Sequence, residues 1–158
     1  MVIHPIEPFY RADSEVLILG SFPSVKSREE GFFYAHPQNR FWRLLAALFK
    51  AETPRTIDDK KKLLADNHVA LWDVIHSCEI NGSSDSSITN VVVNDLSEIL
   101  EKTHVRKIYV NGHKAYNLYK KYLEKRTGFS AECLPSTSPA NAVMTFEGLY
   151  DSWSRIIK

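Results

Sequence analysis

The chain has 158 residues, of which 44% are hydrophobic and 25% charged, and its formal net charge is +1. This balance is typical of one globular domain with its own core, and it excludes a disordered or strongly charged chain. No apolar run approaches the roughly 20 residues of a membrane helix, and the N-terminus lacks the features of an export signal, so we expect a cytoplasmic, single-domain protein over residues 1–158.

Apolar runs that favour β-strands alternate with stretches of helical periodicity along the chain. The predicted strands are 15–20, 69–75, 107–111 and 131–134. The predicted helices are 41–49, 57–65, 96–100, 116–123 and 149–157. Because strands and helices alternate, we predict an α/β fold, namely a three-layer α/β/α sandwich with a central four-stranded parallel sheet.

In such sheets a ligand binds beyond the carboxyl ends of the strands. The segments to search for functional residues are therefore 21–40, 73–90, 111–114 and 135–141. Within the second of these, 81–90 is rich in Ser, Asn and Gly and is predicted to be a loop.

The segment after the first strand is unusually aromatic. It contains Gly20-Ser-Phe-Pro-Ser24 and, further on, Tyr34-Ala-His-Pro-Gln-Asn-Arg-Phe-Trp42. Exposed rings beside polar groups suit stacking on a planar ligand, although the same rings could belong to the core. Asn39 could likewise be a functional residue or only the cap of the helix that follows.

The two cysteines stand alone. Cys78 and Cys133 form no CxxC pair and no Cys/His cluster at ligand spacing. We therefore expect neither a zinc site nor an iron–sulfur cluster, and no cofactor of another kind is indicated.

Three segments, in order along the chain, resemble the mismatch-specific uracil and thymine DNA glycosylases of the uracil-DNA glycosylase superfamily. The first is the aromatic segment just quoted, which is similar to the family's Gly-Ile-Asn-Pro-Gly and Phe-Ala-His-Pro-x-Asn-Arg-Phe-Trp. The other two are Asn111-Gly-His-Lys-Ala-Tyr116 and Leu134-Pro-Ser-Thr-Ser-Pro-Ala-Asn141. The resemblance implies an α/β/α glycosylase that flips a base out of the duplex.

One position departs from that pattern. Where those enzymes carry a catalytic Asn, this chain has Phe22, which can neither hold nor polarise a water molecule. The sequence resembles the hypoxanthine-DNA (deoxyinosine) glycosylase branch more closely, through Gly-Ser-Phe-Pro-Ser at 20–24 and Ala-Leu-Trp-Asp-Val at 70–74. In that branch the residue that matches Asn39 is taken to be catalytic, and we expect it to act by orienting water through its carbonyl oxygen.

The resemblance also implies residues that bind the base. Phe22 and Tyr34 are expected beside the flipped base, with Tyr34 stacking on it, while Asp73 and Asn111 are candidates for reading its edge. Asp73 could equally be a structural residue at a strand end. His36 and His76 could titrate near neutrality, but the resemblance favours a role of the His-Pro pair in loop geometry.

Further residues are expected to contact DNA, since serine hydroxyls and backbone amides bind phosphates. They are Ser21, Ser24, Ser136, Thr137, Ser138, Pro139, Ala140 and Asn141. Related mismatch enzymes place a bulky apolar wedge near the position of Ala140, so the wedge here is either weak or supplied by another segment. Composition alone would make the last segment a plain turn.

These observations predict a monomeric, monofunctional glycosylase that acts on duplex DNA and removes hypoxanthine. Lys114 is expected on a helix face, so no lyase step is predicted. Two alternatives remain: a mismatch-specific uracil or thymine glycosylase, and a nucleic-acid-binding relative that has lost catalysis with the replacement at Phe22.

Overall fold

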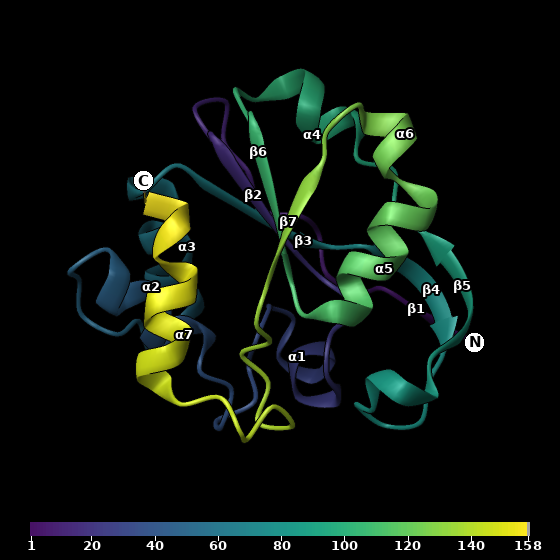
Figure 1. Cartoon of the computed structure of the whole chain (residues 1–158), viewed down its shortest axis with the longest axis horizontal. Helices are drawn as coiled ribbons and strands as arrows, with labels where there is room; N and C mark the ends of the chain where they lie inside the picture. The colour runs from purple at the N-terminus through teal and green to yellow at the C-terminus, as the bar shows by residue number, and fades with distance from the viewer. Residues whose placement is uncertain (158) are drawn as a thin grey trace.

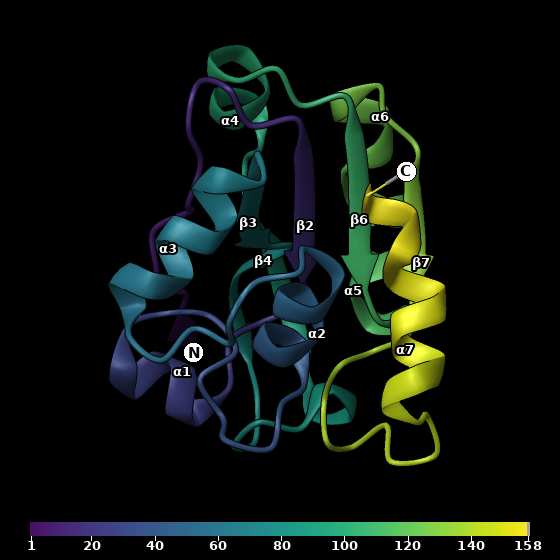
Figure 2. The same cartoon turned by 90° about the vertical axis from the view of Figure 1, so that its left-hand side faces the viewer.

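The structure is a computed structural model that describes residues 1–157. Its centre is a sheet with the strand order β3-β2-β6-β7. The strands are β2 (Val16–Gly20), β3 (Val69–Asp73), β6 (Lys107–Asn111) and β7 (Ala131–Leu134). All neighbouring pairs are parallel, so the four carboxyl ends meet at one edge, the lower edge in Figure 2. The predicted four-stranded parallel sheet is confirmed.

Helices cover both faces of this sheet (Figure 1). One layer contains α2 (Phe41–Leu48), α3 (Ile57–Asp66) and α7 (Phe146–Trp153), which continues into the 3₁₀ turn η2 (Ser154–Ile157). The opposite layer contains α4 (Ser97–Lys102), α5 (His113–Tyr122) and α6 (Glu124–Thr127). Within residues 1–157, none of the helices has the length and apolar character needed to cross a membrane.

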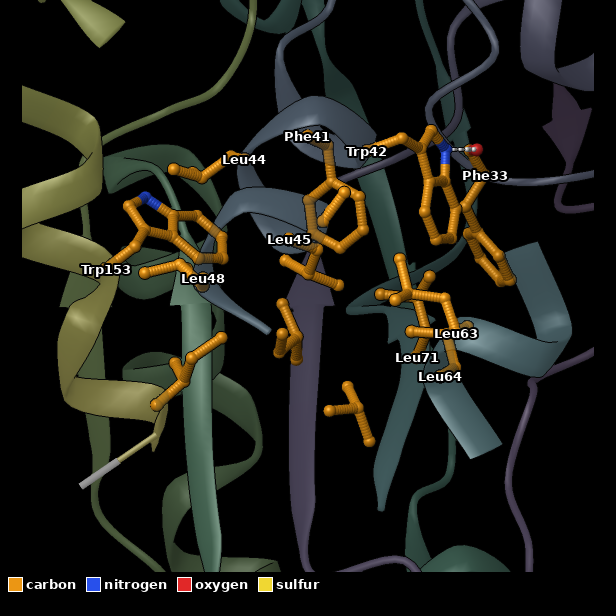
Figure 3. Close-up of a cluster of buried hydrophobic side chains, with 14 of the residues drawn as sticks. Phe33, Phe41, Trp42, Leu44, Leu45, Leu48, Leu63, Leu64, Leu71 and Trp153 are labelled. Carbon is orange, nitrogen blue, oxygen red and sulfur yellow. Dashed lines mark hydrogen bonds between the residues drawn. The ribbon is translucent and has the colours of Figure 1, made fainter. Parts of the chain in front are cut away.

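The core has two parts because successive side chains of a strand point to opposite faces of the sheet. In β2, Ile18 packs toward α2, α3 and α7, whereas Leu17 and Leu19 pack toward α4 and α5, and all three are fully buried. Figure 3 shows the first part, in which the indole N–H of Trp42 donates to the carbonyl of Phe33 at 2.9 Å. This bond satisfies a polar group that the packing of the ring would otherwise leave unpaired.

A second sheet was not predicted. It is antiparallel, has the order β1-β4-β5, and contains β1 (Val2–Ile3), β4 (Ile75–Glu79) and β5 (Thr89–Val93). The prediction of one strand over 69–75 is therefore wrong, because the chain leaves the parallel sheet at Val74. The buried Asn94 holds this break by donating to the carbonyls of Asp73 and Ile75 at 2.8 and 3.1 Å.

Two short helical elements lie outside the main layers. The helix α1 (Val25–Glu30) follows β2 at the carboxyl edge, and it was not predicted because its six residues show no apolar periodicity. The 3₁₀ turn η1 (Asp85–Ser87) interrupts the Ser/Asn/Gly-rich loop between β4 and β5. The end of that loop is already part of β5, so the predicted loop over 81–90 is two residues too long.

Candidate active site

A cleft of about 880 Å³ lies at the carboxyl edge of the parallel sheet. Its walls come from the segments that follow β2, β6 and β7, from Asp73 at the end of β3 and from the loop between β4 and β5. Each of the four segments that the sequence singled out contributes candidate residues to its lining, namely Ser21, Asn39, Asp73, Asn111 and Ser136. The fold thus brings together Ser21 and Ser136, which lie 115 positions apart in the chain.

Asn39 lies immediately before α2 and faces this cleft. Its Oδ1 accepts hydrogen bonds from the backbone N–H of Phe41 at 2.9 Å and from the Thr137 hydroxyl at 2.8 Å. A carbonyl oxygen has two lone pairs, and both are used by these donors. The side-chain NH₂ has no hydrogen-bond partner among residues 1–157, so Asn39 offers the cleft a donor rather than the expected acceptor.

Thr137 connects Asn39 to the end of β6. Its hydroxyl accepts from Asn111 Nδ2 at 3.0 Å, and its backbone N–H donates to Asn111 Oδ1 at 3.0 Å. Thr137 is fully buried and its hydroxyl is committed to these bonds, so its expected role in binding DNA stays a prediction. The two bonds also use one lone pair of Asn111 Oδ1 and one of its N–H groups, so one acceptor site and one N–H of this candidate base reader remain.

Arg40 shapes the loop that follows β7. Its guanidinium donates to the backbone carbonyls of Ser138 at 3.1 Å and Asn141 at 3.0 Å, and also to that of Met144. A planar guanidinium suits this task because it presents several N–H donors in a fixed geometry. No pattern in the sequence indicated this role, although Arg40 stands inside the aromatic segment directly after Asn39.

The other residues predicted to bind DNA in this loop also contribute to its shape. Ser136 Oγ accepts from the N–H of Ser138, and Asn141 Nδ2 donates to the Ser136 carbonyl, at 3.1 and 3.0 Å. Pro139 and Ala140 are exposed at the tip. The loop is therefore pre-shaped, and its tip projects polar backbone and small side chains.

Asp73 is buried at the end of β3 and is paired with His4. The N–H of Ile6 donates to His4 Nδ1 at 3.2 Å, so the ring carries its proton on Nε2, which donates to Asp73 Oδ2 at 2.7 Å. The other oxygen of Asp73 has no hydrogen-bond partner among the described residues. No pattern in the sequence indicated His4, because it precedes the parallel sheet and reaches the site through the unpredicted strand β1.

Tyr34 places a second polar atom beside Asp73. A side chain at Gly20 would bring its Cβ within 2.5 Å of Asp73 Oδ1 and 2.7 Å of the Tyr34 hydroxyl, so both atoms converge over this glycine. The hydroxyl is buried and has no hydrogen-bond partner in the described part of the chain. Burial, with Asp73 nearby, raises the pKa of Tyr34 far above its usual value, which keeps the group protonated as a donor.

The Tyr34 ring already stacks on Phe41, with 4.0 Å between ring centroids. A flipped base could use only its opposite face. Phe22 is also largely buried: it meets the edge of His4 at 5.7 Å between centroids and packs against Ile75 in the core of the second sheet. Both rings line the cleft, so their expected positions beside a base agree with the geometry.

Asp85 enters the cleft from η1, and the sequence analysis missed it. Its Oδ1 accepts a hydrogen bond from the Ser21 hydroxyl at 2.9 Å. Burial of the carboxyl group within the cleft wall raises the pKa of Asp85 above the usual range. The sequence shows only that Asp85 stands in a Ser-rich segment. Such a segment predicts a loop, but it does not show which of its side chains reaches the site.

The remaining candidate side chains have local roles or lie elsewhere. Ser24 caps α1 by accepting from the Ser27 N–H at 3.1 Å, and Ser21 donates to Asp85. The His36 ring accepts from the N–H of Gln38 at 3.1 Å, which agrees with a role in loop geometry. His76 is exposed on β4 outside the cleft. No group of three or more His, Cys, Asp or Glu side chains within 1–157 could hold a metal ion.

The protein is a three-layer α/β/α domain, and its cleft at the strand ends contains asparagines and two carboxylates. This arrangement is typical of an enzyme. The family model of the uracil DNA glycosylase superfamily matches residues 7–154. The chain belongs to this superfamily.

Individual relatives agree with this assignment. The chain is 37% identical to a hypoxanthine DNA glycosylase of Methanosarcina acetivorans over 131 residues, which are 82% of each protein. It is 31% identical to a hypoxanthine DNA glycosylase of Methanosarcina barkeri over 136 residues, 85% of each. A solution NMR structure from M. acetivorans, described as a candidate uracil DNA glycosylase, matches 99% of this chain and 100% of that one with a TM-score of 0.81 and 30% identity.

Proposed function

We propose that this protein is a DNA glycosylase that excises hypoxanthine from deoxyinosine. The observation that carries the proposal is the pair of polar atoms over Gly20: the free oxygen of Asp73, an acceptor, and the Tyr34 hydroxyl, a donor. Hypoxanthine presents the complementary pair, an N1–H donor beside the O6 acceptor. The two relatives named hypoxanthine DNA glycosylases support the same substrate.

The same pair of atoms would reject adenine. Adenine carries an unprotonated N1 and an amino group at C6, so an acceptor would face the Asp73 oxygen and a donor would face the Tyr34 hydroxyl. Sites built to hydrogen-bond one pattern discriminate strongly against the opposite one, because their buried groups would be left unpaired. His4 supports this role, since its bond to Oδ2 fixes the carboxyl group and leaves Oδ1 for the base.

Asn39 is the catalytic residue in this proposal, with a role changed by its hydrogen bonds. Cleavage of an N-glycosidic bond places negative charge on the departing base. The free NH₂ of Asn39 can donate to that base, while its oxygen stays fixed by Phe41 and Thr137. A donor held in place before reaction stabilises charge without having to reorganise.

The reaction is proposed to be monofunctional, with water as the nucleophile. No lysine is among the cleft-lining residues within 1–157, and Lys114 lies on α5 outside the cleft wall. A lyase step would need an amine at the sugar to form a Schiff base. Borohydride treatment during turnover should therefore trap no protein–DNA adduct.

Duplex DNA as the substrate, a monomeric state and a cytoplasmic location belong to the same proposal. The wedge that the resemblance implied near Ala140 is assigned to Val143, three residues further along the loop and 94% exposed. An apolar side chain with almost no protein contact can enter a base step in the minor groove and keep the flipped nucleotide out of the stack. Pro139 and Ala140 would then lie against the backbone beside it.

The test is the identity of the base released from a duplex with one deoxyinosine. Free hypoxanthine should appear, together with an abasic strand that alkali cleaves. Uracil also carries an N–H between carbonyl groups that Asp73 could bind, so an otherwise identical uracil duplex tests the mismatch-specific alternative. Tight binding to both duplexes without release of either base would favour the inactive relative.

A further inference from the structure

The loop between β4 and β5 is fixed against the segment that follows β2 by side chains from both. The N–H of Val25 donates to Ser83 Oγ at 2.9 Å, and Arg28 donates to the Gly82 carbonyl at 2.6 Å. The third contact is the bond from Ser21 to Asp85. These bonds hold the Asp85 carboxylate in the cleft wall, next to Ser21 at the end of β2.

Most of the other polar side chains of the cleft are already committed to other contacts. His113 also lines the cleft, at the start of α5, where its Nδ1 lies 3.8 Å from Cys133 Sγ. The carboxyl group of Asp73 is bound by His4 on one oxygen and is assigned to the base on the other. Asn39 does not titrate, and its oxygen is fully used. The His36 Nδ1 is bound to the backbone of its own loop. Asp85 is the one other carboxylate among the cleft-lining residues of 1–157, and its Oδ2 has no hydrogen-bond partner there.

We propose that Asp85 is a catalytic residue that accepts a proton from the attacking water. As the water oxygen bonds to C1′ of the deoxyinosine, one of its protons moves to the Asp85 carboxylate. The bond between C1′ and N9 breaks, and its electron pair leaves with hypoxanthine, which then takes a proton from solvent. Asp85 afterwards returns its proton to solvent, and no oxidant, reductant or metal is required.

Three properties suit Asp85 to this step. Its negative charge lies in the wall of the cleft that would receive the nucleotide, whose sugar becomes cationic in the transition state. Burial raises its pKa, with a further rise from Asp73 and opposing effects of the Ser21 hydrogen bond and of Lys114. A stronger base is a better proton acceptor at neutral pH. The residue as a whole stays exposed on its outer side, which gives the proton a path to solvent.

This inference rests on the proposed function, and Asp85→Asn tests it. The amide oxygen of Asn can still accept from Ser21, so the loop contact is kept while the proton acceptor is removed. Ser21→Ala makes the opposite change, because it keeps the carboxylate and removes the bond. Glu101→Gln is the matched control, since Glu101 is exposed on α4 at the far end of the sheet.

Single-turnover cleavage of an inosine duplex should fall at least roughly 100-fold in Asp85→Asn, with unchanged affinity for that duplex. The unaltered enzyme should lose rate as the pH falls through the raised pKa of Asp85, because protonation removes the acceptor, and the variant should lack this acidic limb. Ser21→Ala should lose far less activity, and Glu101→Gln should lose none.

If the unaltered protein cleaves inosine DNA but the rate of Asp85→Asn stays within about threefold of it, the role of Asp85 is refuted while the proposed function stands. The same holds if the unaltered rate has no acidic limb. Absence of cleavage by the unaltered protein would instead refute the proposed function.

Discussion

At the scale of single residues, Asn39 has contacts that suit both roles that the sequence left open. It accepts from the N–H of Phe41 in the first turn of α2, as a capping residue would, and its NH₂ faces the cleft. The sequence could place Asn39 in the site because its neighbours match a known pattern. It could not show which end of the amide is free, since that depends on Thr137, 98 residues away.

Asn39→Asp separates these roles better than Asn39→Ala. Aspartate keeps an oxygen for Phe41 and Thr137, so the free energy of unfolding should change little. It cannot donate to a departing base and adds repulsive charge, so single-turnover cleavage should fall by about 100- to 1000-fold. Asn39→Ala should show the same kinetic loss and also lose about 0.5–2 kcal/mol of stability.

The measurements are chemical denaturation, affinity for inosine DNA and the single-turnover rate. Undiminished cleavage by folded Asn39→Asp would mean that the donor has no catalytic role. Weaker folding with normal chemistry in Asn39→Ala would leave only the helix-capping role.

Tyr34 yields a prediction with opposite signs for stability and activity. Its hydroxyl is buried without a hydrogen-bond partner within 1–157, so Tyr34→Phe removes an unsatisfied group and should stabilise the fold by about 1 kcal/mol. The same change removes the proposed donor to O6 and should slow inosine cleavage roughly tenfold. Thermal unfolding and single-turnover rates test both effects. Equal activity of the two proteins would limit Tyr34 to stacking on Phe41.

At the scale of elements, the long apolar runs were predictable and the short, polar ones were not. The runs that became β6 and β7 were predicted with their observed bounds because period and composition agree there. The split at Val74 was not, since apolar residues continue across it and the break depends on the distant Asn94. The second sheet and η1 follow from such contacts between distant segments, and they supply His4 and Asp85 to the site.

Arg40 connects the start of α2 to the loop after β7, and replacing it tests how much this connection contributes to stability and DNA binding. Arg40→Ala should cost about 1.5–3 kcal/mol of stability, because charged hydrogen bonds to three carbonyls are lost, and should weaken binding to inosine DNA. Arg40→Lys should recover only part of this, since an ammonium lacks the planar set of donors.

The control for Arg40 is Arg43→Ala, which removes the same charge from an exposed position of α2 next to Phe146. Calorimetry and DNA binding measure the two effects. If Arg40→Ala and Arg43→Ala weakened DNA binding equally, charge rather than loop shape would explain the result.

The tip of that loop gives a prediction about the DNA wedge. Val143→Ser should leave unfolding unchanged, because the side chain is 94% exposed, and should weaken binding to inosine duplexes about fivefold, or roughly 1 kcal/mol. Val92→Ser makes the same change at a 51% exposed position on β5 and should have no effect on binding. Fluorescence anisotropy with duplex DNA measures both. Equal affinities for Val143→Ser and the unaltered protein would exclude Val143 as the wedge.

At the scale of the whole molecule, topology explains why the site could be anticipated in outline. Parallel strands bring their carboxyl ends to one edge, so four separate segments had to converge once the strand order was given. The net charge of +1 gave no comparable indication of DNA binding. Side-chain pairings that support the site, such as His4 with Asp73, lay beyond prediction because each depends on the register of elements far apart in the chain.

The central claim is that this cleft selects the hydrogen-bonding edge of hypoxanthine and cleaves its glycosidic bond. It is tested most directly by single-turnover rates on duplexes that differ only in one base: hypoxanthine, uracil or adenine. The account predicts rapid release of hypoxanthine, slower release of uracil because Phe22 replaces the polar residue of uracil enzymes, and no release of adenine. Faster release of uracil than of hypoxanthine, or release of no base by the folded protein, would contradict it.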